Sequence, residues 1–371
     1  MKKFAYYLPQ YHTIPENDEW WGKGFTEWTN VKKAKPLFRG HQQPVHPLDG
    51  NYYILDNPNV LKWQAQLALK YGIDGMIFYH YYFCGKKLLE KPAEILLNNT
   101  DIHMHFFFCW ANHDWYRSWE GSKALLMQQK YGGIEEWENH FQYLLPFFKD
   151  ERYEKKDNKP IFMLYKCEFN EKYEMISYFN KRCIESGFDG ISIIETFNHD
   201  AGEREDTFDT LLSSFMNKVS SSTDYIHLRQ PTEVLNWYRT LPEYSFSRIW
   251  NKLGRISRAF GTHFIEKYDG TRLFKVMTRY HVHKSGIING LFMQWDNTPR
   301  HSFRGYVISA PSKSAFFAYL DAIKDEEFVF INAWNEWCEG MMLEPTEENG
   351  YKYLEWIKEW NEKNEDWVNG I

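Results

Sequence analysis

Two glutamates near the carboxyl terminus, Glu336 and Glu339, have the residue type and spacing best suited to chemistry in this 371-residue chain. They stand among Trp334, Asn335 and Trp337, directly after an uncharged aromatic and β-branched run. Such surroundings can raise the pKa of one carboxyl group while another stays ionised, so that one acts as an acid and the other as a base. The alternative is a pair of solvated loop charges, since Glu-x-x-Glu is common on helix surfaces. The aromatic and amide neighbours favour the acid–base interpretation.

An acid–base pair of carboxyl groups suits the cleavage of glycosidic bonds. The leaving oxygen needs a proton, and the sugar needs a base or nucleophile. The composition agrees, because aromatic residues make up 19% of the chain, with 16 Trp, 25 Tyr and 28 Phe. Rings with polar tips pack well on sugars, whereas a merely aromatic core would explain Phe better than Trp. We therefore expect a sugar-binding cleft whose partner is an oligosaccharide or polysaccharide.

The elements that position this pair are predicted to be alternating strands and helices. Eight strands are expected to start at Lys3, Met76, Met104, Pro160, Ile191, Thr210, Leu291 and Phe328. A turn of Gly, an apolar residue, Asp or Asn, and Gly recurs before strands at 72–75, 187–190 and 286–290. A repeated helix-to-strand turn implies parallel strands with helical crossovers. The chain is therefore predicted to be an α/β protein, a (β/α)₈ TIM barrel.

The domain organisation is predicted as one domain over 1–371, with long βα-loop insertions at about 9–57 and 217–284. The first insertion reads as irregular, and a loop of this length is usually functional. The second reads as helical and is basic, with Arg248, Lys252, Arg255 and Arg258. A solvated face is the ordinary meaning of such a segment. The alternative is a patch that holds an anionic glycan or a membrane surface, through peripheral membrane or lipid-linked glycan contact.

Catalytic and binding groups in a TIM barrel lie at the carboxyl ends of the strands. Besides the glutamate pair, the residues that follow each strand, and those of the first loop, are the predicted substrate-binding set: Tyr7, His12, Glu27, Trp28, Tyr79, His80, Trp110, Asn112, Tyr165, Glu195, Trp295, Asp296, Asn297, Arg300, Trp334 and Asn335. The same strand ends also carry Gln10, Tyr82, His113, Asp114, Trp115, Arg117 and Lys166. This crowding at every strand end is a stronger signal than any single motif.

Several other classes are disfavoured. A net charge of −6 gives no sign of a nucleic-acid partner. No glycine-rich phosphate loop follows a strand, and no cofactor is predicted. The pairs His103/His105 and His281/His283 could offer metal ligands, but core or cleft histidines are the commoner meaning, so no metal site is predicted.

The compartment is predicted to be the cytoplasm. Five cysteines, odd in number and without a C-x-x-C pair, read as reduced thiols. The apolar run at the N-terminus is too short for a signal peptide and ends at Pro9. No run of about 18 apolar residues predicts a membrane span.

Five motifs together resemble a known family. They are the runs Tyr-Tyr-Leu-Pro-Gln-Tyr-His at 6–12, Trp-Trp-Gly-Lys-Gly-Phe-Thr-Glu-Trp at 20–28, Trp-Ala-Asn at 110–112, Asp-Asn-Thr-Pro-Arg at 296–300 and Asn-Glu-Trp-Cys-Glu-Gly at 335–340. They resemble the WbsX-type family of bacterial polysaccharide (O-antigen and capsule) gene clusters, which is related to glycoside hydrolase family 99. The resemblance spans nearly the whole chain.

This resemblance implies a (β/α)₈ barrel and a glycosidic-bond enzyme. Family 99 hydrolases are retaining, endo-acting α-mannosidases in which one Glu deprotonates the sugar 2-hydroxyl. That oxygen attacks the anomeric carbon to form an epoxide-like intermediate, while a second Glu is the acid and then the base toward water. By motif, Glu336 would assist the 2-hydroxyl and Glu339 would protonate the leaving group.

The chain departs from the family pattern after the third strand. The family often has Trp-Ala-Asn-Glu-Asn-Trp, whereas this chain has His113 and Asp114 in place of the Glu and second Asn. A role for an acidic side chain at His113 is therefore not carried over. We expect a glycoside hydrolase that acts on a bacterial polysaccharide or its precursor, with no cofactor. Some WbsX-type proteins are labelled glycosyltransferases, which is the alternative; a non-catalytic glycan-binding barrel is the second alternative.

Overall fold

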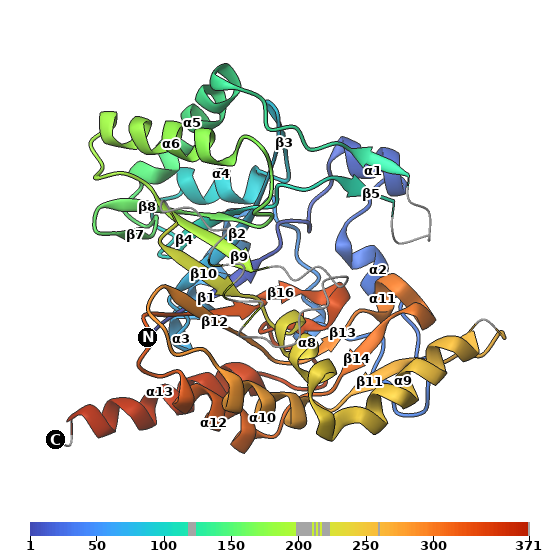
Figure 1. The fold of residues 1–371 in the computed structure, drawn as a ribbon. Coiled ribbons are helices and arrows are strands. Elements are labelled where there is room, and N and C mark those ends of the chain that lie inside the picture. Colours follow the sequence, from blue (N-terminus) through green and yellow to red (C-terminus); the bar gives the residue numbers. More distant parts are fainter. Residues whose placement is uncertain are drawn as a thin grey trace.

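Eight strands close into a barrel in the computed structural model, each running parallel to its neighbours (Figure 1). The structure describes residues 1–117, 124–197, 210, 213, 216, 223–258 and 260–369. In chain order the barrel strands are β1 (Lys2–Tyr7), β2 (Gly75–Phe83), β4 (His105–Trp110), β8 (Lys159–Leu164), β9 (Ser192–Phe197), β10 (Tyr225–Leu228), β12 (Ile287–Phe292) and β15 (Phe328–Asn332). β1 pairs with both β2 and β15, which closes the ring. The predicted (β/α)₈ barrel is confirmed.

Helices surround the barrel. They are α3 (Pro58–Lys70), α4 (Lys91–Asn98), α5 (Ile134–Lys149), α6 (Lys172–Glu185), α8 (Thr232–Thr240), α10 (Gly270–Tyr280), α12 (Lys313–Ala322) and, after the last strand, α13 (Lys352–Asn369). The first turn of α3 illustrates the local signals that set where a helix begins. The Asn57 side chain accepts a hydrogen bond from the Asn59 amide at 2.9 Å, and Pro58 begins the first turn.

Two of the three predicted helix-to-strand turns are confirmed. Gly72 and Gly187 follow α3 and α6 with φ of 75° and 96°, a backbone region that favours glycine. The third was wrong in its bounds, because β12 already begins at Ile287 and contains Gly290. A Cβ at Gly290 would lie 2.5 Å from the Leu228 carbonyl oxygen. This glycine therefore serves a close approach between strands and not a turn.

The predicted sixth strand at 210–215 was also wrong. Of that range the structure describes only Thr210 and Ser213, and both are helical. The strand between β9 and β12 is β10, which pairs with both. It lies inside the segment 217–284 that was expected to be an insertion.

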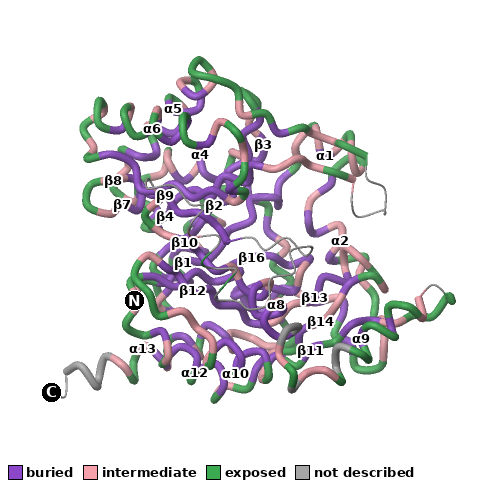
Figure 2. The backbone as a smooth tube through the Cα atoms, in the orientation of Figure 1, coloured by how far each residue is buried: buried purple, intermediate pink, exposed green. Residues whose placement is uncertain are grey.

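The barrel interior is filled with aromatic side chains. Phe4, Phe107 and Phe330 are fully buried, with ring centroids 5.2 and 5.5 Å apart in successive pairs. Every residue of β2 is buried, as expected for a parallel strand covered on both faces (Figure 2). Several buried tryptophans lie outside the barrel interior, such as Trp137 of α5 and Trp237 of α8, whereas Trp21 and Trp115 are only partly buried. The expectation that the Trp content reflects a sugar cleft stays a prediction.

The remaining elements lie at the carboxyl ends of the strands or connect neighbouring segments. Before α3 come α1 (Pro15–Trp21), α2 (Glu27–Lys33) and η1 (Leu48–Gly50). Elsewhere lie β3 (Lys86–Leu88), β5 (Trp115–Tyr116), β6 (Leu125–Met127), β7 (Lys155–Lys156), η2 (Pro242–Tyr244), α9 (Ser245–Arg258), β11 (Glu266–Tyr268), β13 (Trp295–Asp296), α11 (Thr298–His301), η3 (Ser302–Arg304), β14 (Tyr306–Ile308), β16 (Asn335–Glu336), η4 (Trp337–Glu339) and β17 (Met341–Met342). No helix among the described residues is long and apolar enough to cross a membrane.

The segment 9–57 is more regular than expected. Pro15 and two acidic residues begin α1, and Thr26 and Thr29 form a reciprocal capping box at the start of α2. These local signals place Glu27 at the first turn of α2. The helix dipole there favours a negative charge.

Candidate functional site

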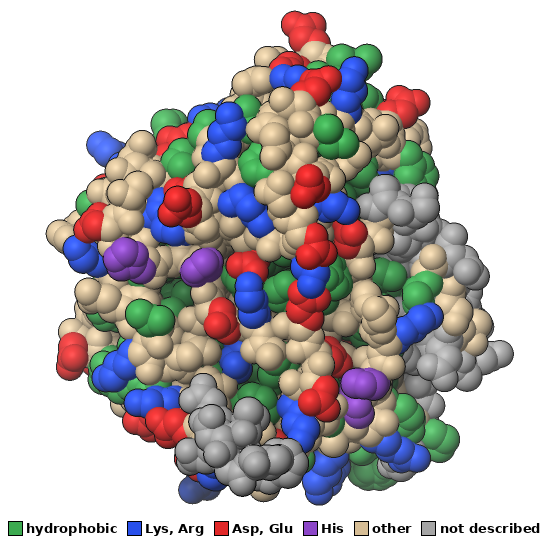
Figure 3. Space-filling view, turned by 90° about the vertical axis from the view of Figure 1, so that its left-hand side faces the viewer, with side chains coloured by type: hydrophobic (Ala, Val, Ile, Leu, Met, Phe, Trp, Pro, Cys, Tyr) green, Lys and Arg blue, Asp and Glu red, His purple; other side chains and the backbone are tan. Residues whose placement is uncertain are grey.

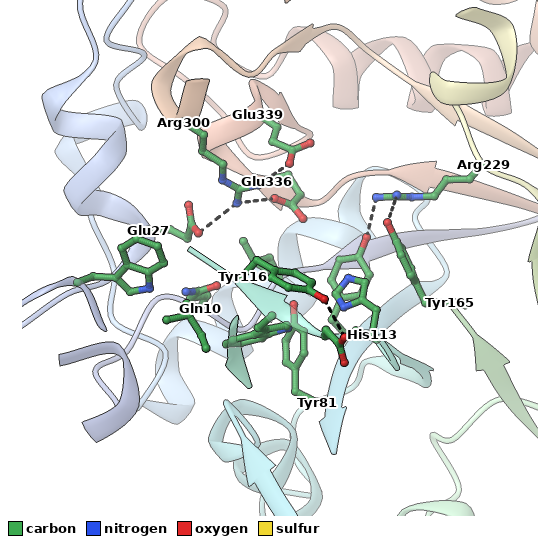
Figure 4. A pocket seen from close by; sticks show the side chains of 17 residues that line it. Gln10, Glu27, Tyr81, His113, Tyr116, Tyr165, Arg229, Arg300, Glu336 and Glu339 are labelled. Atoms are coloured by element: carbon green, nitrogen blue, oxygen red, sulfur yellow. Dashed lines mark hydrogen bonds and ion pairs between the residues drawn. The ribbon is translucent and has the colours of Figure 1, made fainter. Parts of the chain in front are cut away.

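A cavity of about 350 Å³ lies at the carboxyl ends of the barrel strands (Figure 4). Its lining residues come from most of these ends: Leu8, Gln10, Trp21, Glu27, Tyr79, Tyr81, Ala111, His113, Asp114, Trp115, Tyr116, Leu126, Tyr165, Arg229, Arg300, Glu336 and Glu339. The volume falls in the range of roughly 300–1,000 Å³ that small-molecule sites occupy. Polar, charged and aromatic groups face one another across it.

The two glutamates are presented by one tight turn. Strand β16 ends at Glu336, the 3₁₀ turn η4 ends at Glu339, and β17 returns beside β16 with Met341 opposite Glu336. Gly340 closes the turn with φ 59°, and a Cβ there would lie 3.1 Å from the Cβ of Asp296. Backbone conformation and crowding therefore both favour glycine at this position.

One guanidinium joins three carboxylates at this turn. Arg300 contacts Glu27 at 3.1 Å, Glu336 at 3.4 Å and also Glu339, as the dashed lines of Figure 4 show. All four side chains are largely buried, and that of Glu27 is entirely so. A single positive charge cannot balance three buried negative charges, so this group of carboxyls favours holding a proton.

That proton is assigned to Glu336. Burial, followed by the neighbouring charge of Glu339, raises the pKa of Glu336 to about 8, although Arg300 acts in the opposite direction. The site therefore holds a protonated carboxyl next to Glu339, which is ion-paired with Arg300. One proton donor and one acceptor in the same cavity is the arrangement that general acid–base catalysis requires.

A second arginine stands on the opposite wall. Arg229 donates hydrogen bonds to the hydroxyls of Tyr165 at 2.6 Å and Tyr79 at 3.1 Å (Figure 4). It is partly buried, its buried Nε atom has no hydrogen-bond partner, and among the described residues no carboxylate forms an ion pair with it. Its positive charge lowers the pKa of Glu336, as one of the smaller influences on that group.

The wall after β4 carries the residues that depart from the family pattern. Burial lowers the pKa of His113, so its ring is neutral at physiological pH. Asp114 accepts hydrogen bonds from the Gln129 amide at 2.7 Å and the Tyr116 hydroxyl at 2.9 Å. Asp114 therefore braces the β5–β6 hairpin, whose Trp115 and Tyr116 form the aromatic side of the cavity.

The structure brings only part of the predicted set into the cavity. The predicted residues that line it are Glu27, Tyr79, Tyr165, Arg300, Glu336 and Glu339, joined by Gln10, His113, Asp114 and Trp115 from the wider set. The predicted substrate-binding residues that do not line it are Tyr7, His12, Trp28, His80, Trp110, Asn112, Glu195, Trp295, Asp296, Asn297, Trp334 and Asn335.

Strand alternation excludes several of these. Tyr79 and Tyr81 of β2 face the cavity, so His80 points outward, where its Nε2 lies 2.9 Å from that of His140 in α5. Tyr7 likewise donates its hydroxyl to Gln64 of α3 at 2.7 Å. Glu195 pairs with Lys172 of α6 at 3.0 Å.

Two of the predicted asparagines are clamps between neighbouring strand ends. Asn335 accepts from the Leu8 amide at 2.7 Å and donates to the Leu8 carbonyl at 3.0 Å, which ties the turn that carries Glu336 and Glu339 to the end of β1. Asn112 makes the same pair of bonds with Lys166, at 2.7 and 2.8 Å. The side-chain amides of Asn335 and Asn112 therefore hydrogen-bond to backbone groups and do not face a ligand.

Other predicted residues support the site from behind. Asp296 accepts from the Thr298 hydroxyl and from Gln43 at 2.6 Å, and its carboxylate lies 2.8 Å from His41 Nε2. The Asn297 carbonyl oxygen accepts from the Tyr306 amide at 2.9 Å. These contacts anchor α11, and hence Arg300.

The predicted rings that miss the cavity pack behind it. Trp28 and Trp110 donate to backbone carbonyl oxygens, and Trp295 packs edge-on against Tyr306. Trp334 is fully buried, and burial lowers the pKa of His12 to about 4. These side chains shape the walls and do not face the ligand space.

The cavity-lining residues that the sequence did not single out as site residues are Leu8, Trp21, Tyr81, Ala111, Tyr116, Leu126 and Arg229. Arg229 was missed because the sixth strand was placed at 210–215. The run Tyr-Ile-His-Leu at 225–228 was a usable strand signal, and Arg229 follows it directly. Within the described ranges, no group of three or more His, Cys, Asp or Glu side chains is arranged to hold a metal ion.

Comparison with known proteins adds the family and the fold relatives. The family model described as glycosyltransferase WbsX matches residues 3–357. Two proteins named "Uncharacterized protein WxcX", from Xanthomonas campestris pv. campestris strains B100 and ATCC 33913, are 31% and 32% identical over 95% of the chain. The chain spans about half (48%) of the length of these relatives.

Solved structures share the fold at low sequence identity. A GH99 endo-alpha-mannosidase from Bacteroides thetaiotaomicron, in complex with BIS-TRIS-propane, matches with a TM-score of 0.56 and 11% identity, covering 100% of this chain and 98% of that one. A structure described as a glycoside hydrolase-like protein matches with a TM-score of 0.55 and 13% identity, covering 97% and 93%. These likenesses establish a common barrel architecture.

Proposed function

The chain belongs to the WbsX family, and from this premise we propose that it cleaves a glycosidic bond in a bacterial polysaccharide or its precursor. Family and fold together point to a glycan-processing enzyme. The observation that carries the finer proposal is the pair Glu336 and Glu339, which share Arg300 at the wall of a cavity large enough for a sugar. An α-mannoside is the first substrate to test, because the fold relatives are named α-mannosidases.

The proposed reaction uses the single proton of the pair. Glu339 donates it to the leaving oxygen, and Glu336, as the carboxylate, takes a proton from the sugar 2-hydroxyl, whose oxygen attacks the anomeric carbon. Water then opens the intermediate: Glu339 takes a proton from the water, Glu336 returns its proton to the 2-oxygen, and the anomeric configuration is retained. Before substrate binds, the proton of the pair rests on Glu336, and it passes to Glu339 when the leaving oxygen enters beside Arg300.

A carboxyl with a raised pKa suits the base in this scheme. Once ionised, Glu336 is a stronger base than an ordinary carboxylate, and a sugar hydroxyl is a very weak acid. Arg300 then stabilises the ionised carboxylates, and Arg229 holds the two tyrosine hydroxyls that face them.

Leaving-group dependence tests both roles. We expect Glu339→Gln to lower the cleavage of an unactivated α-mannoside by about 10²- to 10⁴-fold, while a nitrophenyl glycoside, which needs no protonation, is spared. Glu336→Gln should lower the turnover of both substrates. Glu348→Gln, an exposed change in the loop after β17, is the matched control and should leave both rates unchanged.

Two outcomes would overturn parts of this proposal. If Glu336→Gln spares the nitrophenyl glycoside and Glu339→Gln does not, the acid and base roles are reversed. If both variants cleave both substrates at the wild-type rate, the pair is not catalytic. Products from polysaccharide of the source strain, followed by NMR, report the anomeric configuration.

A glycosyltransferase is the second candidate, and Arg229 is the structural observation that favours it. A partly buried guanidinium without a carboxylate partner among the described residues could bind the diphosphate of a sugar nucleotide. Calorimetry with a panel of sugar nucleotides separates the two functions. A transferase should bind one of them, and Arg229→Met should weaken that binding; a hydrolase should bind none.

A further inference from the structure

Helix α9 presents its apolar side to solvent. Phe246, Ile249, Trp250, Leu253 and Ile256 each have another of this set three or four residues away, Phe260 follows just beyond the end of the helix, and each is at least 50% exposed. Such spacing places the five helical residues on one face. Scattered exposed apolar residues are ordinary, but five in one stripe indicate an interaction surface.

The opposite side of α9 packs on the protein. Asn251 is buried, and a Cβ at Gly254 would lie 2.2 Å from the Phe264 ring. Arg255 pairs with the buried Glu266 at 3.1 Å. A surface helix ordinarily buries its apolar stripe. The orientation of α9 is the reverse, because its buried side makes these contacts with the body of the protein.

The charge around this stripe is mainly basic. Between residues 245 and 265 the sequence has four basic residues and no Asp or Glu; Lys252 is exposed, whereas Arg255 and Arg258 pair with Glu266. The segment 28–48, which follows the start of α2, also has no Asp or Glu, and Lys32, Lys33, Lys35 and Arg39 are all exposed. Helix and segment meet, because Phe38 and Trp250 line one groove of about 390 Å³ and Lys267 lies over the Phe38 ring.

We propose that α9 and the basic segment 32–39 bind an anionic lipid surface, with the stripe in the interface and the lysines and arginines against the headgroups. An amphipathic helix with Trp, Phe and Leu on one side and Lys and Arg on the other is the type that lies in the plane of a membrane. The segment 32–39 adds electrostatic attraction to acidic headgroups. We name Ile249, Trp250, Leu253, Lys252, Lys35 and Arg39 the lipid face.

Charge argues against a second copy of the chain as the occupant. A twofold pairing would bring identical faces together, and therefore their basic flanks, at a cost in like-charge repulsion. An anionic bilayer matches both features of the lipid face. The face seen in Figure 3, at the amino ends of the barrel strands, differs, since Lys and Arg there are interspersed with Asp and Glu.

The position of the lipid face also suits the cavity. α9 extends from the side of the molecule where α2, α11 and the carboxyl ends of the strands lie (Figure 1). β11, which follows α9, joins β14 and β13 in one small sheet, and β13 leads into α11 with Arg300. If the proposed function holds, the cleft is presented to glycans held at a membrane.

Co-sedimentation with vesicles tests the lipid face without reference to catalysis. The 371-residue chain is mixed with vesicles of pure phosphatidylcholine or of phosphatidylcholine with phosphatidylglycerol, at low and high salt. We expect binding only to vesicles that contain phosphatidylglycerol, weakened by salt, with a blue shift of Trp fluorescence that Trp250→Ser removes.

Two sets of variants have matched controls. The triple change Ile249→Ser, Trp250→Ser and Leu253→Ser should lower binding more than about tenfold. Its control places Ser at Leu69, Ile134 and Ile184, which are equally exposed on other helices. Reversal to Glu at Lys35, Arg39 and Lys252 should lower binding at least a hundredfold, at about fivefold or more per base. Its control is the same reversal at the exposed Lys149, Lys181 and Lys275.

Thermal unfolding confirms that each variant is folded before its binding is compared. Equal binding to both kinds of vesicle, or equal loss in the controls, would contradict the proposal. So would a salt-insensitive dimer in lipid-free solution that only the Ser variant at 249, 250 and 253 dissociates. That result would assign the stripe to a second copy. Loss of vesicle binding with intact glycosidase activity would leave the proposed function standing.

Discussion

At the scale of single residues, the wall of the site around Arg300 contains more acidic than basic side chains. Arg300 serves three buried carboxylates, and Arg229 on the other wall has phenol hydroxyls as its partners. Burial makes this imbalance costly, and a proton on Glu336 relieves it. Stability and the proposed catalysis therefore depend on the same proton.

The stability of the protein should fall as Glu336 loses this proton. The pKa of Glu336 is about 8 in the folded chain against 4.5 for an ordinary glutamate, so between these values the folded state binds a proton that the unfolded state lacks. Raising the pH through this window therefore destabilises the fold. Glu336→Gln removes the effect, so its Tm advantage over the wild type should grow from pH 5 to pH 8, by about 2 °C or more.

Calorimetry at half-unit pH steps measures this difference. Glu348→Gln, an exposed carboxyl of the following loop, is the control. A Tm difference between Glu336→Gln and the wild type that stays constant with pH would show that Glu336 keeps an ordinary pKa.

At the scale of elements, one buried carboxyl group holds the turn that carries Glu336 and Glu339. Glu344 accepts hydrogen bonds from Trp337 Nε1 at 2.7 Å, Gln64 Nε2 at 2.7 Å and the Tyr53 hydroxyl at 2.8 Å. Trp337 belongs to η4, Gln64 to α3, and Tyr53 to the segment before α3. One side chain thus joins the turn to the outer layer, and burial raises the pKa of Glu344 to about 7.

Removal of Glu344 should loosen the turn. Glu344→Ala leaves three buried donors without their acceptor, and we expect the free energy of unfolding to fall by about 2–4 kcal/mol. Because Glu336 and Glu339 flank Trp337, kcat should fall as well. Urea unfolding measures the first effect and turnover the second. Glu347→Ala, three residues on and exposed, is the control. Equal stability of the two variants would refute this role.

At the scale of the whole molecule, some aromatic residues form the core of the barrel and others are exposed on the surface. Phe107 is fully buried in the barrel, where it packs on Phe4 and Phe330, whereas Phe246 of α9 is 81% exposed. The first kind stabilises the fold through burial. The second kind contributes almost nothing to folding, which is why the stripe on α9 calls for an external partner.

A pair of substitutions separates these two roles. Phe107→Ala should destabilise the chain by about 3–5 kcal/mol, because it removes a buried ring from a closed barrel. Phe246→Ala should change the free energy of unfolding by less than about 0.5 kcal/mol, as for an exposed site. Denaturant unfolding without lipid measures both. A large loss for Phe246→Ala would mean that α9 packs on the body of the protein through its stripe.

The sequence by itself determined the barrel, the family and the glutamate turn. Buried parallel strands show as unbroken apolar runs, and Asn57-Pro58 or Gly72 mark helix ends through local chemistry. The turn at 335–340 is likewise contiguous. The motif can therefore be recognised from these consecutive residues alone.

Only the tertiary structure decided which strand-end residues meet. The direction of a side chain depends on strand alternation, so His80 and Tyr7 face the helices while Tyr79 faces the cavity. Asn112 and Asn335 turned out to be clamps because their partners lie 54 and 327 residues away in the chain. Arg229 entered the site through a strand that was placed too early, and α9 showed its apolar stripe to solvent against the usual rule. Each outcome depends on contacts between distant segments, which no local pattern encodes.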